Sequence, residues 1–376
     1  MKRFAALMLC LAIVLSLAAC GGNSTTQADS ASAAGSSTTA STPSASADPT
    51  TTELVDDTTG LKIPCDPIEL SMGCAGTVDG TVMGDAIDKY LAELKDWTDG
   101  NFVINFYPSG QLGGDTDLIQ GTQMGSVDIF NGAPTSQVGL IPQLAVLDIA
   151  GLYDNVDQCN QVLSGGFLDQ IEPYYNEAGL HLLTAYTTDF RITSSNNPIN
   201  SLADLKGLNL RVQENKYHIA FWKALGANPT PLAFGELYIA LQQGMMDAQE
   251  NPWVSYVGAN LCEVQKYMTL TNHIPFISTY VMNNAKYESL SDAQKQALNQ
   301  FIYSVKKYIV EGTAADDARL QKLCEDQYGL VVSDVPADIK AKYPEATQTV
   351  IDLMKKDIDP AFVDSYVAAA KAATGK

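Results

Sequence analysis

The chain has 376 residues, of which 46% are apolar and 18% are charged. Its 43 acidic and 23 basic residues give a net charge of −20, and the sequence shows no basic stripe, which argues against nucleic acid as a partner. An acidic balance favours solubility and says little about the fold, so an anionic ligand would have to be bound by local positive groups.

The first twenty residues have the pattern of an export signal. Lys2 and Arg3 form a basic start, an apolar run extends to about Leu17, and small residues follow. The ending LAAC at residues 17–20 resembles the lipobox of bacterial lipoproteins, in which the cysteine, here Cys20, is lipidated and becomes the mature N-terminus. The alternatives are an ordinary signal with a chance cysteine or a short membrane helix, although the apolar run is short for a bilayer span.

A tether is predicted for residues 21–65. Between Gly21 and Thr52, 16 of the 32 residues are Ser or Thr, and none is aromatic, Lys or Arg. Such a segment buries too little apolar surface to fold. It therefore indicates a flexible link between a lipid anchor at Cys20 and a globular body that begins near Asp66.

Strand and helix patterns alternate along the globular part. In chain order the sequence predicts a strand at 68–74, a helix around 83–94, a strand at 101–107, a helix at 115–124, strands at 126–130, 181–186 and 208–212, and helices at 217–225 and 237–243. From 291 to about 328, good helix formers with the single glycine Gly312 predict one long helix or two nearly continuous ones. This order predicts an α/β fold with mainly parallel sheets, in which a long helix could brace two lobes.

Catalytic signals are weak. His181, His218 and His273 show no metal-ligand spacing, and each is interpreted as a surface or core histidine. The sequence has no P-loop, no dinucleotide fingerprint and no Gly-x-Ser-x-Gly elbow, and a Ser-x-x-Lys match at 304–307 is interpreted as chance. We therefore predict no enzyme activity, no cofactor and no metal.

The cysteines give no disulfide framework. Apart from Cys10 in the signal and Cys20, five remain, and an odd number argues against complete pairing. Buried free thiols are the simpler interpretation, although one or two bridges stay open. The five are Cys65, Cys74, Cys159, Cys262 and Cys324.

Two polar features suggest ligand binding. In the predicted strand at 208–212 the aliphatic residues share one face, and Asn209 and Arg211 lie on the other. Arginine suits a carboxylate because it is always charged and donates two parallel hydrogen bonds, although pairing with an acidic side chain of the protein is the alternative. Asn251 precedes Pro252 and is therefore expected to be extended, with a donor and an acceptor available. As a local signal, this second segment predicts only a polar loop.

The segment from Arg211 to Pro252 resembles the solute-binding proteins of TRAP (tripartite ATP-independent periplasmic) transporters. The matching stretches read LKGLNLRVQENK, ALGANPTPLAFGELYIALQQGMMDAQENP and EVQKYMTLTNHI, and upstream FYPSGQLGGDTDLIQGTQMGSVDI. Arg191, twenty residues before Arg211, also matches. The similarity extends from about Leu70 to at least Asn283.

The resemblance implies a two-lobed fold of the periplasmic-binding-protein type (type II), with a long helix shared by both lobes. Lobe I would comprise residues 66–188 and about 277–316, and lobe II residues 189–276 and about 317–376. It also implies ligand-binding roles: Arg211 for the ligand carboxylate, Arg191 as an assisting arginine, and Asn251 and Phe234 as further pocket positions.

The departures from the family pattern bear on the ligand. Sialic-acid-binding members carry an Asn near the first strand and charged residues after the third, whereas here 72–76 and 131–136 offer none of them. A smaller or more apolar carboxylate than sialic acid is therefore expected. Asn131, Trp253 and Tyr256 could line the pocket, with packing roles as the alternative.

The resemblance thus implies a lipid-anchored, monomeric binding protein on the extracytoplasmic face of the membrane or in the periplasm. It would capture a small organic carboxylate and deliver it to TRAP membrane subunits. A binding module for a sensor or receptor, or an exported lipoprotein hydrolase, are the alternatives. An ATP-driven importer's binding protein has a similar architecture, but the QENP pattern argues against it.

Overall fold

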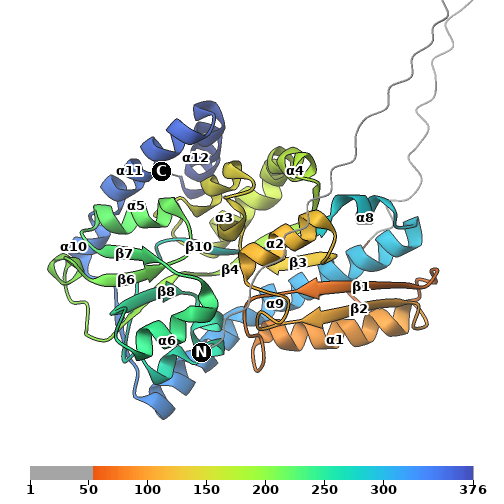
Figure 1. Ribbon diagram of the computed structural model, residues 1–376, viewed down its shortest axis with the longest axis horizontal. Coiled ribbons are helices and arrows are strands. Elements are labelled where there is room, and N and C mark those ends of the chain that lie inside the picture. Colours follow the sequence, from red (N-terminus) through yellow and green to blue (C-terminus); the bar gives the residue numbers. More distant parts are fainter. Residues whose placement is uncertain (1–53, 376) are drawn as a thin grey trace, which may run out of the picture. The chain divides into compact units, whose positions relative to one another are not determined.

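Two β-sheets covered by helices organise the protein (Figure 1). The structure, a computed structural model, describes residues 54–375, which fall within one compact unit formed by residues 50–376. The predicted signal segment and Cys20 lie outside the described residues. None of the helices in the described range is long and apolar enough to cross a bilayer.

The first sheet has five strands. In its strands at 68–73 and 102–107, the buried residues Leu70, Met72, Phe102 and Ile104 stand at every second position, and this period-two pattern predicted the second of the two strands. In spatial order the strands are β2 (Phe102–Tyr107), β1 (Ile68–Gly73), β3 (Ile129–Gly132), β10 (Pro275–Asn283) and β4 (Leu180–Phe190).

The second sheet has six short strands. In spatial order these are β11 (Val331–Asp334), β9 (Tyr267–Leu270), β5 (Ile192–Ser195), β8 (Ala248–Asn251), β6 (Asn209–Val212) and β7 (Asn228–Pro231). The chain passes from the first sheet to the second through a single residue, Arg191, between β4 and β5, and it returns between β9 and β10. At this crossing the backbone N–H of Arg191 donates to the carbonyl of Ile274 at 2.8 Å.

Both sheets are mixed: two of the four strand pairs in the first sheet and three of the five in the second are parallel. β1 is parallel to β2 and β3, but β10 is antiparallel to β3 and β4. In the second sheet β5 is antiparallel to β8 and β9. The crossings explain this: β4–β5 leaves the first sheet while β9–β10 returns to it, so the two crossing segments run past each other in opposite directions.

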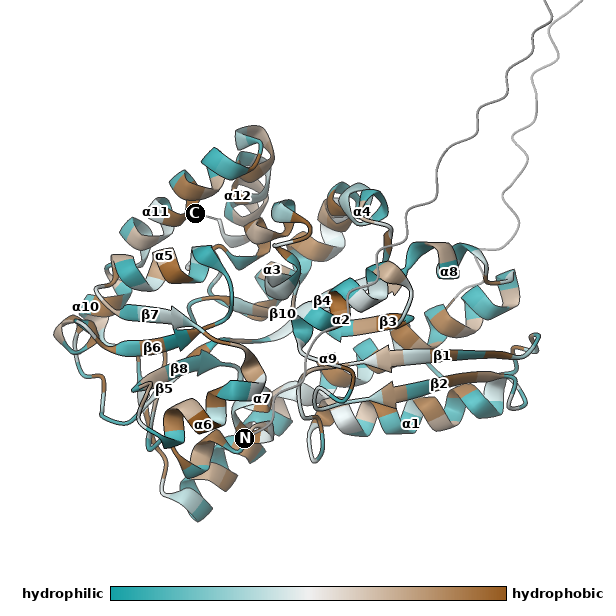
Figure 2. Ribbon diagram, viewed as in Figure 1, coloured by the Kyte–Doolittle hydropathy of each residue, from teal (hydrophilic) through white to brown (hydrophobic). Residues whose placement is uncertain are grey.

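Twelve α-helices of the described chain flank the sheets and link them. They are α1 (Val82–Trp97), α2 (Asp115–Met124), α3 (Val156–Val162), α4 (Leu168–Glu177), α5 (Lys216–Ala224), α6 (Leu237–Gln242), α7 (Trp253–Gly258), α8 (Asn284–Glu288), α9 (Asp292–Tyr328), α10 (Ala337–Lys340), α11 (Tyr343–Asp357) and α12 (Pro360–Thr374). Figure 2 shows brown and teal alternating along α1, as expected for a helix with one buried face.

Helix α9 is one continuous helix of 37 residues shared by the two lobes. Its N-cap is Ser291, whose side chain accepts from the N–H of Gln294, and it ends at Gly329 in the left-handed conformation. It packs on α1 and β4 of the first lobe and on α7 of the second, and Figure 1 shows it extending from one sheet toward the other. A helix of this length can stay in contact with both lobes while they move relative to each other.

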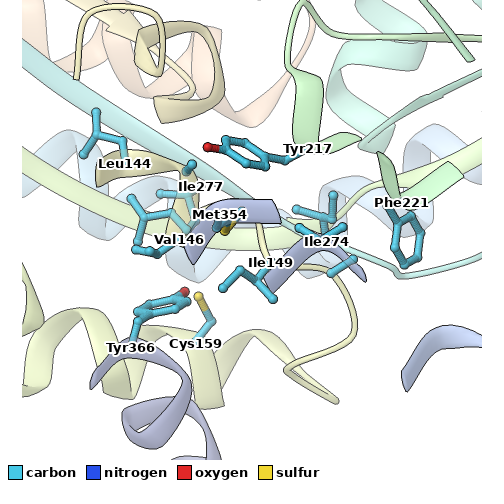
Figure 3. Packing of buried hydrophobic residues seen from close by; sticks show 14 of the residues in the cluster. Leu144, Val146, Ile149, Cys159, Tyr217, Phe221, Ile274, Ile277, Met354 and Tyr366 are labelled. Carbon is cyan, nitrogen blue, oxygen red and sulfur yellow. The ribbon is translucent and has the colours of Figure 1, made fainter. Parts of the chain in front are cut away.

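The largest core cluster joins residues from both lobes with the C-terminal helices. Figure 3 shows Ile149, Phe221, Ile274, Met354 and Tyr366 packed together, although they come from distant parts of the sequence. Helix α11 packs on α5 and α12 packs on α3. The C-terminal helices therefore cover both lobes.

Residues 54–65 belong to the folded body, which corrects the predicted end of the tether at residue 65. Val55 exchanges two backbone hydrogen bonds with the side-chain amide of Gln300 on α9, at 2.9 and 2.8 Å. Ile63 is buried, and its N–H donates to the carbonyl of Trp97 at 2.7 Å. Composition cannot predict this contact, because it depends on an acceptor 245 residues away in the chain.

Candidate ligand-binding site

A cavity of about 70 Å³ lies where side chains of the two lobes meet. The first lobe contributes Cys74, Met83, Asp115, Asn131, Phe276 and Ser278, and the second contributes Gln213, Phe234, Asn251, Val254 and Ser255. A wider groove of about 860 Å³ lies along α4, β4 and α9 and contains none of the predicted ligand-binding residues. We therefore place the candidate site at the smaller cavity, which collects Asn131, Phe234 and Asn251.

Arg211 lies on β6 with its guanidinium buried behind the cavity wall. The side chain is 1% exposed, and its Nε and Nη2 atoms donate to the carbonyl of Leu232 at 2.9 and 2.6 Å. The guanidinium lies 6.0 Å from the ring of Phe234, which lines the cavity. Its Nη1 is buried and has no hydrogen-bond partner among the described residues 54–375. Burial lowers the pKa of Arg211 to about 10, so the group stays charged at neutral pH.

The predicted alternative, an arginine neutralised by an acidic side chain of the protein, applies to Arg191 and not to Arg211. Arg191 is 2% exposed, and its Nε and Nη2 atoms both donate to the carboxylate of Glu250. Nη2 also reaches the Glu250 carbonyl at 2.5 Å and Oδ1 of Asn251 at 3.1 Å. Arg191 is thus tied to β8, where it orients Asn251, and its predicted direct contact with a ligand stays a prediction.

Two buried histidines complete this charged network. His273 Nε2 lies 3.1 Å from Glu250, and His218 lies 3.7 Å from both Glu250 and Asp148. Burial lowers the pKa of His273, whereas Asp148 and Glu250 outweigh burial and raise the pKa of His218. Burial alone would raise the pKa of Glu250, but Arg191 and the two histidines hold it well below its usual range. The network is a fixed polar base beneath the site.

Asn251 and Asn131 face the cavity from opposite lobes. The QENP segment, predicted as a polar loop, forms the buried strand β8 in the interior of the second sheet. There Asn251 donates to Oε1 of Gln249 at 2.6 Å. Asn131 on β3 donates to Ser278 and to the carbonyl of Thr279, both at 3.3 Å. Both amides are thereby held in one orientation.

Trp253 lies in the hydrophobic core of the second lobe. It is 5% exposed, meets Tyr256 edge to face with ring centroids 6.0 Å apart, and is not among the residues that line the cavity. Tyr256 is fully buried in the same core cluster. The structure therefore gives both residues the packing role that the sequence left as the alternative.

Asp115 and Gln213 also line the cavity, although neither was predicted as a site residue. Gln213 follows Arg211 by two residues, so strand periodicity could have placed it on the same face. Asp115 is the first residue of α2, and burial raises its pKa to about 6 despite the opposing charge of Arg211. No local signal separates this aspartate from the many others in an acidic chain.

These observations define a class of protein. Two α/β lobes, linked by crossing strands and a shared helix, enclose a small cavity lined by both apolar and polar side chains. Such a site suits the capture of one small solute by lobes that close around it.

Comparisons with known proteins identify the family. The family described as bacterial extracellular solute-binding protein, family 7, matches residues 75–357, and this chain belongs to it. A solute-binding protein of Verminephrobacter eiseniae is 30% identical over 281 residues, covering 74% of this chain and 78% of the relative. The 2,3-diketo-L-gulonate-binding periplasmic protein YiaO of Escherichia coli is 30% identical over 274 residues, covering 73% and 83%.

Solved structures share the fold. The sugar acid binding protein DctPAm of Advenella mimigardefordensis, in complex with galactonate, superposes with a TM-score of 0.77 at 26% identity over 82% of this chain and 99% of that one. A TRAP periplasmic solute-binding protein of Roseobacter denitrificans with bound β-D-glucuronate gives 0.76 at 27% identity, over 81% and 99%. The two-lobed fold and the TRAP-type family predicted from the sequence are confirmed, and these relatives are binding proteins rather than enzymes.

Proposed function

We propose that this chain captures a small organic carboxylate outside the cytoplasm through Arg211 and delivers it to TRAP membrane subunits. Relatives whose names specify a ligand include binders of the sugar acids 2,3-diketo-L-gulonate and galactonate, which carry a carboxylate. The cavity of about 70 Å³ is small beside the roughly 300 Å³ or more of typical drug-sized sites, which supports a compact ligand.

The observation that carries this proposal is the unpartnered Nη1 of Arg211. A buried donor without a hydrogen-bond partner is destabilising by roughly 1–3 kcal/mol, and by more when it is charged. Nε and Nη2 of Arg211 both donate to the Leu232 carbonyl, so the guanidinium is fixed in place. A ligand carboxylate beside Nη1 would supply the missing acceptor in a charge-assisted hydrogen bond.

Binding and closure are coupled in this proposal. Asn131 and Ser278 face the ligand from the first lobe, and Gln213 and Asn251 face it from the second. A ligand that contacts both sets binds the closed arrangement more tightly than an open one and shifts the population toward it. The closed protein is then the form that docks on the membrane subunits.

Titration of Arg211 variants tests the role of this side chain. Arg211→Ala should weaken binding of the ligand by about 30-fold to several thousandfold, because truncating one partner of a buried charge pair costs roughly 2–5 kcal/mol. Arg211→Lys should also lose much of the affinity, since lysine lacks the planar fork. Isothermal calorimetry with a panel of sugar acids, hydroxy acids and dicarboxylates would measure both.

The matched control is Lys62→Ala, which removes an exposed cation that pairs with Asp99. It should bind as the unchanged protein does. Equal affinity of Arg211→Ala and the unchanged protein for the same acid would show that this arginine does not bind the ligand.

The proposal includes membrane attachment through a lipid on Cys20, based on the LAAC ending of the export signal. The Ser/Thr-rich segment after it would let a monomeric body move near the membrane surface. Cys20→Ser should shift the protein from the membrane fraction to the soluble fraction, and an unchanged distribution would contradict the anchor.

A further inference from the structure

A second, smaller cavity adjoins the candidate ligand site. It has a volume of about 20 Å³ and shares Met83, Val254, Phe276 and Ser278 with the ligand cavity. A cavity needs roughly 10–15 Å³ to hold one water molecule, so this side chamber has room for a single group of that size. A ligand in the main cavity could extend one such group into it.

The side chamber is lined by three aspartates, of which two have partners. Asp189 accepts from the backbone N–H groups of Phe190 and Trp253, at 2.6 and 3.2 Å. Asp316 accepts from the N–H of Val82 at 2.9 Å and pairs with Arg319 at 2.6 Å.

The third aspartate, Asp317, is the one without a partner. Within residues 54–375 its carboxylate makes no ion pair and no hydrogen bond, although it is partly buried on α9. A carboxylate in this position lacks a cation.

A second observation points to a missing group in the same chamber. Tyr186 lines it and is 2% exposed, and its hydroxyl, which lies near Ser278 and Tyr280, has no partner of standard hydrogen-bond geometry within residues 54–375. Thr188 and Thr313 add further hydroxyls to the wall. A buried hydroxyl is normally satisfied, so the chamber has polar atoms ready for a guest that donates hydrogen bonds.

The carboxyl groups in the chamber disfavour one another's charged forms. Burial raises the pKa of Asp189 to about 6, and burial together with Asp189 and Asp316 raises the pKa of Asp317 to about 8. The nearby cation, Arg319, is already paired with Asp316. A positive group in the chamber would favour the charged forms instead.

We propose that the ligand carries an ammonium group that enters the side chamber beside Asp317 while its carboxylate binds Arg211, so that the ligand class is a small amino-carboxylate. The inference rests on the proposed function, because Arg211 fixes the other end of the ligand. An ammonium matches the volume and donates to several oxygens at once. Within the described residues no group of three or more His, Cys, Asp or Glu side chains is arranged to hold a metal ion, which favours an ammonium over a metal here.

Matched ligand pairs test the inference. Each pair consists of an ω-amino acid and the same acid without the amine: glycine and acetate, β-alanine and propanoate, 4-aminobutanoate and butanoate, 5-aminopentanoate and pentanoate. Calorimetric titration of the purified full-length protein should give at least one amino acid that binds about tenfold or more tightly than its partner acid. In Asp317→Asn that preference should fall to about twofold or less, while the affinity for the plain acid changes little.

Asp326→Asn is the control, because it makes the same change on an exposed part of the same helix, where Asp326 pairs with Lys322. It should keep the full preference. Melting temperature without ligand should not fall in Asp317→Asn, since the change replaces a carboxyl group whose charged form is disfavoured there.

The outcomes separate the inference from the proposed function. Plain acids that bind through Arg211 as tightly as their amino counterparts would overturn the inference and leave the carboxylate site intact. The inference would also be overturned if Asp317→Asn still preferred the amino acids. The same holds if Na⁺ increased the affinity for the plain acids, because the ion would then take the place of the amine. If no amino acid of any pair binds, the inference fails. A co-purified ligand whose mass spectrum shows no basic nitrogen would also contradict it. If binding of an acid is unaffected by Arg211→Ala, the proposed function itself fails.

Discussion

The two buried arginines near the cavity, Arg191 and Arg211, have different surroundings in the fold. Arg191 is neutralised by Glu250, while Arg211 donates to a backbone carbonyl and keeps one donor unpaired. Residue type and strand periodicity indicated Arg211 as a carboxylate-binding candidate, and the family resemblance added Arg191. Periodicity could not distinguish the two, because the acid that pairs with Arg191 lies 59 residues away.

Glu250 is the residue whose removal should disturb the charged network most. Glu250→Gln would leave Arg191 buried without its counter-charge, which typically destabilises a protein by about 3–5 kcal/mol. Because the pKa of Glu250 is held below its usual range, this contribution is present above about pH 4.5, the ordinary value of a glutamate, and is lost as the pH falls through the lowered pKa.

Urea unfolding followed across the pH range measures this effect. The variant should be clearly less stable than the unchanged protein at pH 7, and the difference should narrow in acid. Glu177→Gln, at an exposed position on α4, is the control and should have little effect. A constant small difference at every pH would contradict the assigned role of Glu250.

At the scale of elements, local patterns located the boundaries of two helices well, but they did not predict α3, α4, α7 or α8. Helix α2 is observed over the predicted range, 115–124, and α9 begins and ends within a residue of the predicted range. Both have strong helical sequences and clear boundaries. The strand expected at 126–130 is observed as β3 at 129–132, so its start was placed three residues too early.

Strands β8 and β10 were not predicted, for different reasons. The sequence AQEN of β8 has low strand propensity, and its extended form is imposed by neighbours on both sides and by the Arg191–Glu250 pairing. β10 is a nearly continuous apolar run, which periodicity alone does not assign to strand or helix. In both cases tertiary contacts decide the structure.

Gly312 lies at the contact between α9 and the first turn of α1. A Cβ at this position would come within 2.5 Å of Cγ2 of Val82, so the two helices approach too closely for a side chain. Gly312→Val should therefore destabilise the protein by about 1–3 kcal/mol through overpacking. Thermal and urea unfolding would measure this.

Ala314→Val is the comparison, because it adds a β-branched residue at an exposed position of the same helix. It should cost only the small helix-propensity difference, about 0.5 kcal/mol. Equal stability of the two variants would show that the α1–α9 contact is looser than described.

At the scale of the whole molecule, the lobes meet closely at the edge of the cavity. Gly258, the last residue of α7 in the second lobe, lies against the backbone of Thr77 in the first, where an added Cβ would be 2.6 Å from the Thr77 carbonyl oxygen. The contact is between backbone groups, so it cannot be relieved by a side-chain rotation. It requires the two lobes to approach as closely as the structure shows.

Gly258→Ala should oppose closure and weaken ligand affinity by about 5- to 100-fold, the equivalent of roughly 1–3 kcal/mol of overpacking. The fold of each lobe should be unaffected, so the melting temperature without ligand should change little. Gly139→Ala, where an added Cβ meets nothing within 4 Å, is the control. Unaltered affinity in Gly258→Ala would argue that this contact is absent from the ligand-bound form.

The role of Arg211 can be observed in a crystal structure of the protein with its co-purified or titrated carboxylate ligand. We expect a carboxylate oxygen within hydrogen-bonding distance of Nη1 of Arg211, with Asn131 and Asn251 facing the same molecule. A ligand bound elsewhere, with Nη1 still unpaired or taken by an acidic side chain of the protein, would contradict it.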